Sequence, residues 1–224
     1  MKNITVAVDG YSSCGKSTMA KTLAKSVGYI YVDTGAMYRS VALYALRHNY
    51  VSGGVVDVER LASDLDNVAI TFAPDGKAML NGECVESEIR GIEVSKAVSH
   101  VSAIPEVRAH LVKLQKAMGD KGGVVMDGRD IGTVVFPNAE LKLFVTADAA
   151  IRARRRFDEL KAKGQSADYD EILANVKERD HLDETRAVSP LRRADDAIVL
   201  DNSNMTIDEQ NLWVMEKFKE ACQD

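Results

Sequence analysis

The stretch Gly10-Tyr11-Ser12-Ser13-Cys14-Gly15-Lys16-Ser17 decides the fold, because it matches the pattern G-x-x-x-x-G-K-[ST] of a phosphate-binding loop. Residues 4–8 before it are apolar and mostly β-branched, which predicts a buried strand. Residues 18–27 after it place Met19 and Leu23 at helical spacing. A strand, a glycine-bounded loop and a helix in this order distinguish a functional phosphate loop from a chance glycine turn.

The residue types of this loop suit a nucleoside triphosphate. Gly10 and Gly15 allow backbone angles and close approaches that a Cβ atom would block. Successive N–H groups can then point into one concavity at the positive end of the helix dipole. Lys16 can reach the β- and γ-phosphates, and the Ser17 hydroxyl can bind Mg²⁺. We therefore expect ATP and Mg²⁺ to bind residues 10–17 together with Thr18.

Composition excludes several classes of protein. The chain has 224 residues, of which 46% are hydrophobic, enough for one sizeable core. A net charge of −5 argues against nonspecific binding to nucleic-acid polymers, and no apolar run is long enough to span a membrane. The N-terminus begins directly with a strand, so we expect no signal peptide. The three widely spaced cysteines are expected to be free thiols, which predicts a cytoplasmic protein.

Apolar strand-like runs alternate with helical segments along the chain. The predicted core strands are residues 4–8, 29–32, 124–126, 141–145 and 197–201. This alternation predicts an α/β fold with a doubly wound, mostly parallel five-stranded sheet that carries helices on both faces. We treat residues 1–224 as a single domain of the phosphate-loop NTPase class.

Residues 51–92 have a different texture. Short strand-like runs are separated by tight turns, and Asn81-Gly82 between two such runs is a strong hairpin signal. These residues predict a small antiparallel module inserted between the α/β elements.

Further helices are predicted on either side of this module and at the end of the chain. Pro105 is expected in the first turn of a helix over residues 106–118. The final helix, over residues 206–222, is expected to bury the apolar residues Ile207, Leu212, Val214, Met215 and Phe218, with Trp213 packing nearby.

A second polar group precedes the predicted helix over residues 36–48. Thr34 and Arg39 lie five residues apart at its start. A helix cap with a surface arginine explains these residues as well as a binding site does. In a phosphate-loop enzyme, however, a second polar site suggests a second substrate.

Asp127 follows the predicted strand over residues 124–126, and Arg129 and Asp130 come directly after it. The carboxyl ends of parallel strands are where open α/β sheets bind ligands. Asp127 alone could be a turn residue, or it could contact hydrated Mg²⁺. The cluster as a whole favours a binding site.

Two predicted helices are rich in arginine. The helix over residues 149–163 carries Arg152, Arg154, Arg155 and Arg156 within about one turn. A solvated basic face would explain them, but we favour neutralisation of a polyphosphate, because the rest of the chain is acidic. In the helical stretch over residues 169–186, Arg179, Asp183 and Arg186 share one face, as ordinary helical ion pairs also would.

Four segments together resemble the bacterial cytidylate kinases. They are Gly10 to Ser17, Asp33-Thr34-Gly35-Ala36-Met37-Tyr38-Arg39, Asp127-Gly128-Arg129-Asp130-Ile131-Gly132-Thr133-Val134-Val135-Phe136-Pro137, and Lys177-Glu178-Arg179-Asp180. The resemblance spans essentially the whole chain and includes the inserted module. The segment beginning at Asp127 is highly specific, whereas the phosphate loop alone would not be.

This resemblance implies ATP-dependent phosphorylation of CMP and dCMP to the diphosphates. It implies a nucleoside monophosphate-binding region over residues 34–95, which contains the module at about 51–92, and a mobile lid over residues 150–170. The implied acceptor-binding residues are Thr34, Arg39, Ser99, Arg108, Arg129, Asp130, Arg179, Asp183 and Arg186. Arg39, Arg129 and Arg179 would hold the acceptor phosphate, and Asp183 with Arg186 would lie on the sugar and cytosine side.

The same resemblance implies that Arg152, Arg155 and Arg156 belong to the lid. Arg152 and Arg156 would bind ATP, while Arg155 would join Lys16, Arg129 and Arg179 in catalysis. Nothing in the sequence demands a dimer, so we expect a monomer.

This chain departs from the resembled family inside the phosphate loop. Tyr11, Ser13 and Cys14 replace residues that are often proline, glycine and a small residue. Ser13 would be strained if its position needs a positive φ. Because a thiol at a helix N-terminus can have a depressed pKa, we also expect alkylation of Cys14 to inactivate the enzyme and ATP to protect it.

Two rival functions remain open from the sequence. A kinase for a nucleoside or for a different monophosphate is the nearer one, although a nucleoside kinase would not need an arginine clamp for an acceptor phosphate. The other is a regulatory module that only senses ATP, which would have no evident use for the lid arginines.

Overall fold

The computed structural model describes residues 3–162 and 164–223. The chain divides into two compact units. Unit 1 comprises the residues up to Tyr31 together with those from Lys121 onward, and unit 2 comprises Val32–Asp120.

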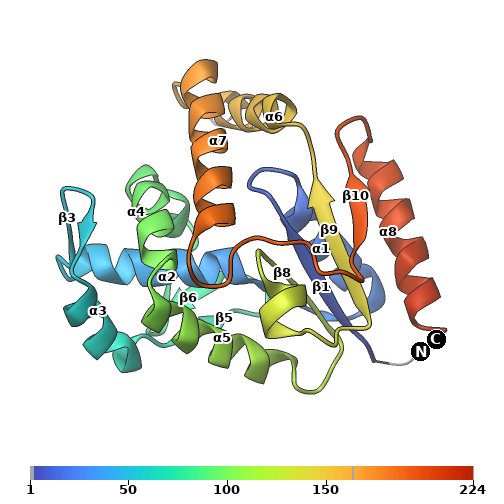
Figure 1. Cartoon of the computed structure of the whole chain (residues 1–224), viewed down its shortest axis with the longest axis horizontal. Helices are drawn as coiled ribbons and strands as arrows, with labels where there is room; N and C mark the ends of the chain where they lie inside the picture. The colour runs from blue at the N-terminus through green and yellow to red at the C-terminus, as the bar shows by residue number, and fades with distance from the viewer. Residues whose placement is uncertain (1–2, 163, 224) are drawn as a thin grey trace. The chain divides into compact units, whose positions relative to one another are not determined.

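The sheet has five strands in the order β10-β9-β1-β8-β2, which confirms the predicted five-stranded architecture (Figure 1). The strands are β1 (Thr5–Gly10), β2 (Ile30–Asp33), β8 (Val124–Gly128), β9 (Leu141–Thr146) and β10 (Ile198–Asp201). β1 pairs in parallel with β8 and β9, and β9 pairs in parallel with β10. The central strand β1 is almost wholly buried, as expected for a parallel strand covered on both faces.

Helices α1 (Lys16–Val27) and α8 (Ile207–Ala221) pack together against the sheet in unit 1. Met19 and Leu23 of α1 join Val214 and Phe218 of α8 in one apolar cluster. The final helix therefore exists as predicted, and Met215 and Trp213 are partly buried against its cluster.

Two of the residues predicted to be buried in α8 are not. Ile207 is 65% exposed and Leu212 is 73% exposed. The helix packs through one stripe of side chains, and these two residues lie outside it, so the prediction that they are buried is wrong.

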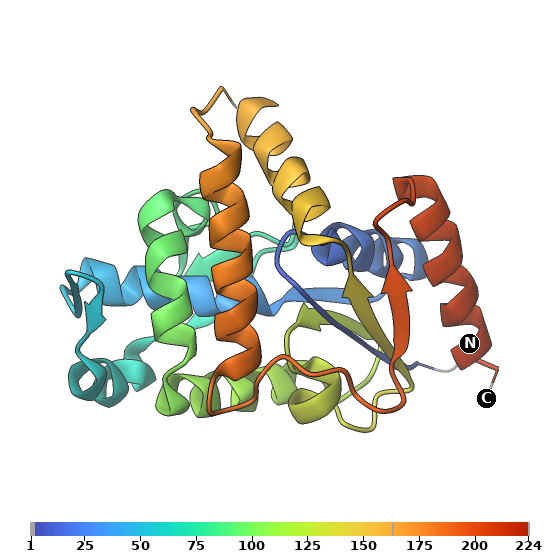
Figure 2. The same cartoon turned by 45° about the horizontal axis from the view of Figure 1, so that its top comes forward.

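Helices α6 (Ala149–Ala162) and α7 (Tyr169–Thr185) lie side by side in both views of unit 1 (Figures 1 and 2). The Tyr169 hydroxyl donates to the Ala150 carbonyl over 3.2 Å, and the Arg154 guanidinium lies over the rings of Phe157 and Tyr169. Lys163, the predicted last residue of the first of these helices, lies outside the described residues.

Unit 2 is built from helices and two small antiparallel sheets. The helices are α2 (Thr34–Arg47), α3 (Val58–Asp64), α4 (Ile92–Ser102) and α5 (Pro105–Gly119), with short 3-10 turns at Leu65–Asn67 and Glu88–Arg90. Strands β3 (Val51–Ser52) and β4 (Val55–Val56) form a hairpin, and β5 (Ile70–Phe72), β6 (Ala78–Leu80) and β7 (Glu83–Cys84) form the second sheet. Pro105 occupies the first turn of α5, as predicted.

The predicted antiparallel sheets in the inserted segment are confirmed. Leu80 pairs with Glu83, so Asn81 and Gly82 form a two-residue loop between β6 and β7. Both have positive φ, 50° and 84°, which is the backbone that a tight hairpin of this kind requires.

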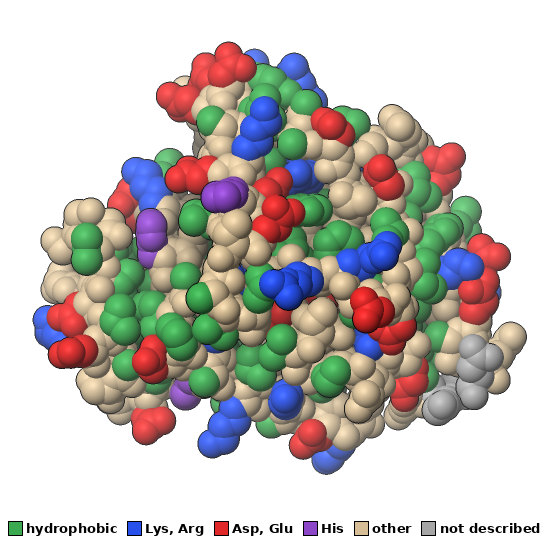
Figure 3. All heavy atoms as spheres, in the orientation of Figure 1, with side chains coloured by type: hydrophobic (Ala, Val, Ile, Leu, Met, Phe, Trp, Pro, Cys, Tyr) green, Lys and Arg blue, Asp and Glu red, His purple; other side chains and the backbone are tan. Residues whose placement is uncertain are grey.

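Charges of both signs are interspersed on the face shown in Figure 3, and no broad basic area is visible on that face. Among the described helices, none is long and apolar enough to cross a lipid bilayer.

Candidate active site

The phosphate loop joins the carboxyl end of β1 to the start of α1, as the sequence predicts. A Cβ atom on Gly10, whose φ is 150°, would clash with the carbonyl oxygen of Val145 in the neighbouring strand β9. Gly15 has a φ of 84° and precedes the first residue of α1. Both positions therefore require glycine. Ser13 also has a positive φ, 58°, which confirms the strain expected of a serine there.

The loop is folded around one carbonyl group. The Lys16 ammonium and the Cys14 thiol both donate to the Tyr11 carbonyl, over 2.9 and 3.0 Å. Cys14 is fully buried, which works against the expected alkylation. Within the described chain, the backbone N–H groups of residues 12–15 have no hydrogen-bond acceptor, so they remain available to an anion.

Tyr11 ties this loop to three other elements of unit 1. Its ring meets Phe144 of β9 edge-to-face at 5.9 Å, and the Arg152 guanidinium lies 5.0 Å from its centre. Its hydroxyl donates to Glu184 near the end of α7 over 2.6 Å. Tyr11, one of the three loop residues that depart from the resembled family, therefore anchors the loop to α6 and α7.

Asp127 and Ser17 form the candidate Mg²⁺ site. The Ser17 hydroxyl donates to one Asp127 oxygen over 2.7 Å, and the Tyr31 hydroxyl donates to the other over 2.7 Å. Mg²⁺ prefers oxygen ligands and keeps several waters, so one hydroxyl and one carboxylate beside a phosphate loop fit it. Clusters of three or more His, Cys, Asp or Glu suited to a metal are absent from the described residues.

Lys16, Arg129 and Arg179 form a cluster of cations, and the charge of Asp127 acts on the first two. Lys16 is buried, and burial together with the charges of Arg129 and Arg179 lowers its pKa. Burial and the neighbouring Arg129 lower the pKa of Arg179 to about 10. Arg179 has no hydrogen bond or ion pair with any other described residue. Cations that disfavour each other in this way form a site that a polyanion would stabilise.

Asp183 orders two of the predicted arginines. It accepts from Nε of Arg129 over 2.7 Å and lies 3.6 Å from Nη1 of Arg186. Burial alone would raise the pKa of Asp183, but the charges of Arg129 and Arg179 hold it below its ordinary value. Arg186 also donates from Nε to the Ser189 carbonyl. Asp183 and Arg186 of the predicted shared face thus form an ion-pair network with Arg129, and Arg179 of that face lies outside this network.

The arginines of α6 have separate partners. Arg152 makes a bidentate pair with Asp180 of α7, over 2.7 and 3.0 Å, and also donates to the carbonyls of Ser12 and Ala147. Arg155 donates to the side chain and carbonyl of Asn202, and Arg156 pairs with Glu159. Asn202 in turn donates to the Cys14 carbonyl over 2.7 Å, so Arg155 is linked to the phosphate loop.

Unit 2 holds the remaining predicted acceptor residues. Asp33 caps α2 by accepting from Ala36 N, and Thr34 is buried beside it. Arg39 donates to the Ile89 carbonyl over 3.1 Å and to the Ser95 hydroxyl over 3.0 Å. These contacts hold the Arg39 guanidinium at a defined place.

Arg108 and Ser99 lie deeper in this unit. Arg108 is 1% exposed, donates to the Ser102 carbonyl over 3.1 Å and lies 5.1 Å from the centre of the Tyr38 ring. Ser99 is half-buried on α4, and its carbonyl accepts from the Ser102 hydroxyl. Unit 1 therefore brings Lys16, Asp127, Arg129, Asp130, Arg179, Asp183 and Arg186 into one region, while Thr34, Arg39, Ser99 and Arg108 belong to unit 2.

Sequence reasoning missed several residues that hold this site. Asp9, Ser95, Asp180 and Asn202 all hydrogen-bond to predicted site residues or to the segments that carry them. Asp9 and Asn202 could have been suspected, because each lies at the carboxyl end of a core strand. Asp180 and Ser95 carried no sequence signal, since only the fold places them beside Arg152 and Arg39.

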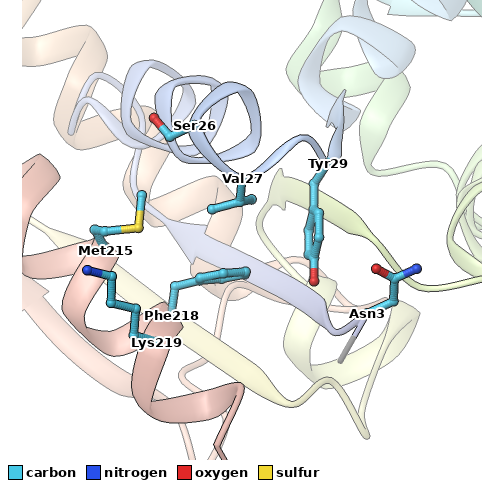
Figure 4. Close-up of a pocket in the computed structure, with 7 residues that line it drawn as sticks. All are labelled: Asn3, Ser26, Val27, Tyr29, Met215, Phe218 and Lys219. Carbon is cyan, nitrogen blue, oxygen red and sulfur yellow. The ribbon is translucent and has the colours of Figure 1, made fainter. Parts of the chain in front are cut away.

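A separate pocket of about 480 Å³ lies at the other end of the sheet in unit 1 (Figure 4). It is lined by Asn3, Ser26, Val27, Tyr29, Met215, Phe218 and Lys219. Tyr29 and Phe218 meet edge-to-face at 5.4 Å there. Asn3 precedes β1 and Val27 ends α1, so this pocket is remote from the phosphate loop.

Comparison with known proteins agrees with this geometry. The family model described as cytidylate kinase matches residues 6–220. A cytidylate kinase of Phocaeicola vulgatus is 57% identical, with 99% of each chain covered, and one of Bacteroides thetaiotaomicron is 55% identical, with 100% of each covered. A solved structure of an uncharacterized protein from Eubacterium ventriosum has a TM-score of 0.52 at 12% identity, covering 98% of this chain and 99% of that one, which supports the fold alone. The chain belongs to the cytidylate kinase family.

Proposed function

We propose that this protein phosphorylates CMP and dCMP with ATP, giving CDP and dCDP by direct in-line transfer of the γ-phosphoryl group. The observation that carries this proposal is the cluster of Lys16, Arg129 and Arg179 at the carboxyl end of the parallel sheet, beside a phosphate loop with available N–H groups. A kinase that joins two anionic nucleotides needs this concentration of positive charge.

The acceptor phosphate binds Arg39, Arg129 and Arg179 in this proposal. Asp183 and Arg186 contact the sugar and cytosine side, with Thr34, Ser99, Arg108 and Asp130 completing the acceptor site. The ion pair between Arg129 and Asp183 supports this arrangement, because it orients the guanidinium before substrate arrives.

The chemical step needs no strong general base, because a phosphate oxygen is already a competent nucleophile. The barrier comes from repulsion between two anions and from misalignment. Lys16 and the arginines offset the charge and place the acceptor oxygen in line with the γ-phosphorus, and such positioning contributes on the order of 7–11 kcal/mol. Ser17 would hold Mg²⁺ directly and Asp127 would hold it through water. When bound, the ion would offset part of the negative charge of the triphosphate.

The lid arginines have different roles in this proposal. Arg156 pairs with Glu159, which is exposed, so this pair can break when ATP binds. Since the charge of Arg156 also acts on Arg179, we place the Arg156 guanidinium near the ATP phosphates. Arg152 and Arg155 bind ATP or the transferring group only if they exchange their partners Asp180 and Asn202 for phosphate oxygens. Closure of α6 and α7 over both substrates would exclude water and limit hydrolysis of ATP.

A coupled assay of ADP release tests the function with CMP, dCMP, UMP, AMP, GMP and cytidine as acceptors. We expect fast turnover with CMP and dCMP and little with the purine nucleotides or cytidine. Preference for cytidine or for another monophosphate would identify a different small-molecule kinase. Saturable ATP binding without acceptor-dependent ADP release would identify an ATP sensor.

We further propose a cytoplasmic monomer that acts on small nucleotides and binds no nucleic-acid polymer. All three cysteines are free, which fits a reducing compartment. Light scattering of the purified protein tests the monomer, and a dimer mass would contradict it.

A further inference from the structure

Asp9 is a buried carboxylate that the proposed reaction does not use. It is the residue before Gly10 of the phosphate loop, and it is 5% exposed. One of its oxygens accepts from the backbone N–H of Ile131 and the other from that of Gly132, each over 2.8 Å. Both acceptors therefore point away from the ATP loop and toward the turn after β8.

That turn carries two of the predicted acceptor residues. Arg129 and Asp130 directly precede Ile131, where the chain enters a short π-helical turn over Ile131–Val135. Asp130 has an unusual backbone, with φ −144° and ψ 25°. Because Asp9 holds the next two amides, it fixes the direction in which the backbone leaves Asp130.

The glycine at position 132 leaves room for the Asp9 carboxylate beside the turn. Gly132 has no Cβ, and one placed there would lie 3.4 Å from an Asp9 oxygen and 3.2 Å from Cδ of Lys142. The charges of Lys16 and Asp130 also act on Asp9, favouring and disfavouring its ionised form respectively. Asp9 thus faces Lys16 of α1, Asp130 and the amides of the turn, and the stem of Lys142 of β9 lies nearby.

We propose that Asp9 is a positioning residue for the acceptor nucleotide, acting through the backbone of Ile131 and Gly132 to place Arg129 and Asp130. This inference deepens the proposed function and rests on it. Although Asp9 adjoins the ATP loop, its substitution should therefore affect mainly the binding of CMP.

The variant Asp9→Asn tests this role, because it keeps the shape of the side chain. The asparagine NH₂ group would face a backbone N–H that has no other acceptor among the described residues, and losing a buried hydrogen bond of this kind changes binding by about tenfold. We expect the KM for CMP to rise about tenfold while the KM for ATP changes less than about threefold. Equal rises in both KM values, or no rise for CMP, would overturn the proposal.

Gly132→Ala gives a second test that leaves Asp9 intact. The added methyl group would lie 3.2 Å from Cδ of Lys142 and in contact with the Asp9 carboxylate, so these side chains must move by a few tenths of an ångström. We therefore expect a smaller rise in the KM for CMP than in Asp9→Asn and no rise in that for ATP. Asp201→Asn is the matched control, since Asp201 ends β10 and also accepts a backbone N–H, from Ser203. An equal effect of the control on the KM for CMP would contradict a specific role for Asp9.

Amide hydrogen exchange separates failure of this inference from failure of the proposed function. Ile131 and Gly132 should exchange slowly in the wild-type protein and faster in Asp9→Asn, whatever the substrate. Wild-type protein inactive on CMP would refute the function and leave this exchange result as the test of the Asp9 contact. Unchanged exchange in the variant would overturn the inference.

Discussion

The turns after β1 and after β8 lie at the same edge of the sheet but treat their backbone amides in opposite ways. In the phosphate loop, the N–H groups of residues 12–15 have no acceptor within the described chain. In the turn after β8, the N–H groups of Ile131 and Gly132 are bound by Asp9. The first turn can bind phosphate with its backbone, whereas the second is fixed internally and presents the side chains of Arg129 and Asp130.

This difference explains why one turn has a compact sequence motif and the other a long one. Backbone binding depends on a few glycines and a lysine at set spacing. Side-chain presentation depends on every residue that sets the direction of the chain, including Gly132 and the distant Asp9. Substitutions in one turn or the other should therefore separate these two roles.

Lys16→Met should remove the charge that the phosphate loop contributes to the transition state. Turnover should fall by roughly 10²–10³, as when one preorganised electrostatic group is lost. Affinity for CMP, measured by calorimetry, should change little, because the second turn is untouched. Lys21→Met, at an exposed position of α1, is the control and should behave as wild type. A loss of less than tenfold for Lys16→Met would contradict the role of the first turn.

Arg179→Ala should lower turnover by more than about tenfold while the protein stays folded. The side chain faces Arg129 and Lys16 and has no described hydrogen-bond partner to lose, so its removal should cost activity and not stability. Steady-state kinetics with circular dichroism measures both. Lys177→Ala, at an exposed position of α7, is the matched control and should keep wild-type turnover. Near-normal turnover of Arg179→Ala would count against a role of Arg179 in holding the acceptor phosphate.

Asp127→Asn should weaken the proposed Mg²⁺ site formed with Ser17. The variant keeps a hydrogen bond to Ser17 but loses the charge, so the Mg²⁺ concentration for half-maximal rate should rise about tenfold, as is typical for residues that support a bound metal. A titration of rate against Mg²⁺ at saturating ATP measures this shift. The same midpoint in both proteins would place the ion elsewhere.

The smallest effect concerns stability and pH. Burial raises the pKa of Asp9 to about 7, from an ordinary value near 3.8. Between these two pKa values, Asp9 keeps its proton in the folded protein but has released it in the unfolded chain. The stability that protonated Asp9 contributes is therefore present at low pH and is lost as the pH rises through about 7. From pH 6 to pH 8 the wild type should lose about 1 kcal/mol more unfolding free energy than Asp9→Asn.

Urea unfolding of both proteins at pH 6 and pH 8 measures that difference. If the free energy of unfolding changes equally in the two proteins between pH 6 and pH 8, Asp9 stays ionised throughout this range. Its two backbone N–H donors would then lower its pKa more than burial raises it.

Much of the fold could be predicted, because periodicity reports directly on local structure. The strand before Gly10, the hairpin at Asn81-Gly82 and the proline-started helix at Pro105 all depend on neighbours in the sequence. The wrong predictions for Ile207 and Leu212 have a different origin. Which stripe of a helix is buried depends on the surface that it meets, and that surface comes from β1 and α1 far away in the chain.

The residues of the candidate site likewise fall into those that the sequence identifies and those that only the fold brings together. Lys16, Ser17 and Arg129 lie in contiguous motifs and could be named from the sequence. Their supports could not, since Asp9 meets Ile131 across 122 residues and Asn202 meets Cys14 across 188. The role of Arg152 also changes once its pair with Asp180 is seen, because that contact requires α6 and α7 to pack together.

Among the proposed interactions, the one that matters most is the binding of the acceptor phosphate by the cations Arg129 and Arg179. Calorimetric titration of CMP and of cytidine into the wild-type protein tests it most directly, because the two ligands differ only in that phosphate. We expect CMP to bind on the order of 100-fold more tightly than cytidine, because its phosphate forms several charge-assisted hydrogen bonds. Equal affinity for CMP and cytidine would contradict it.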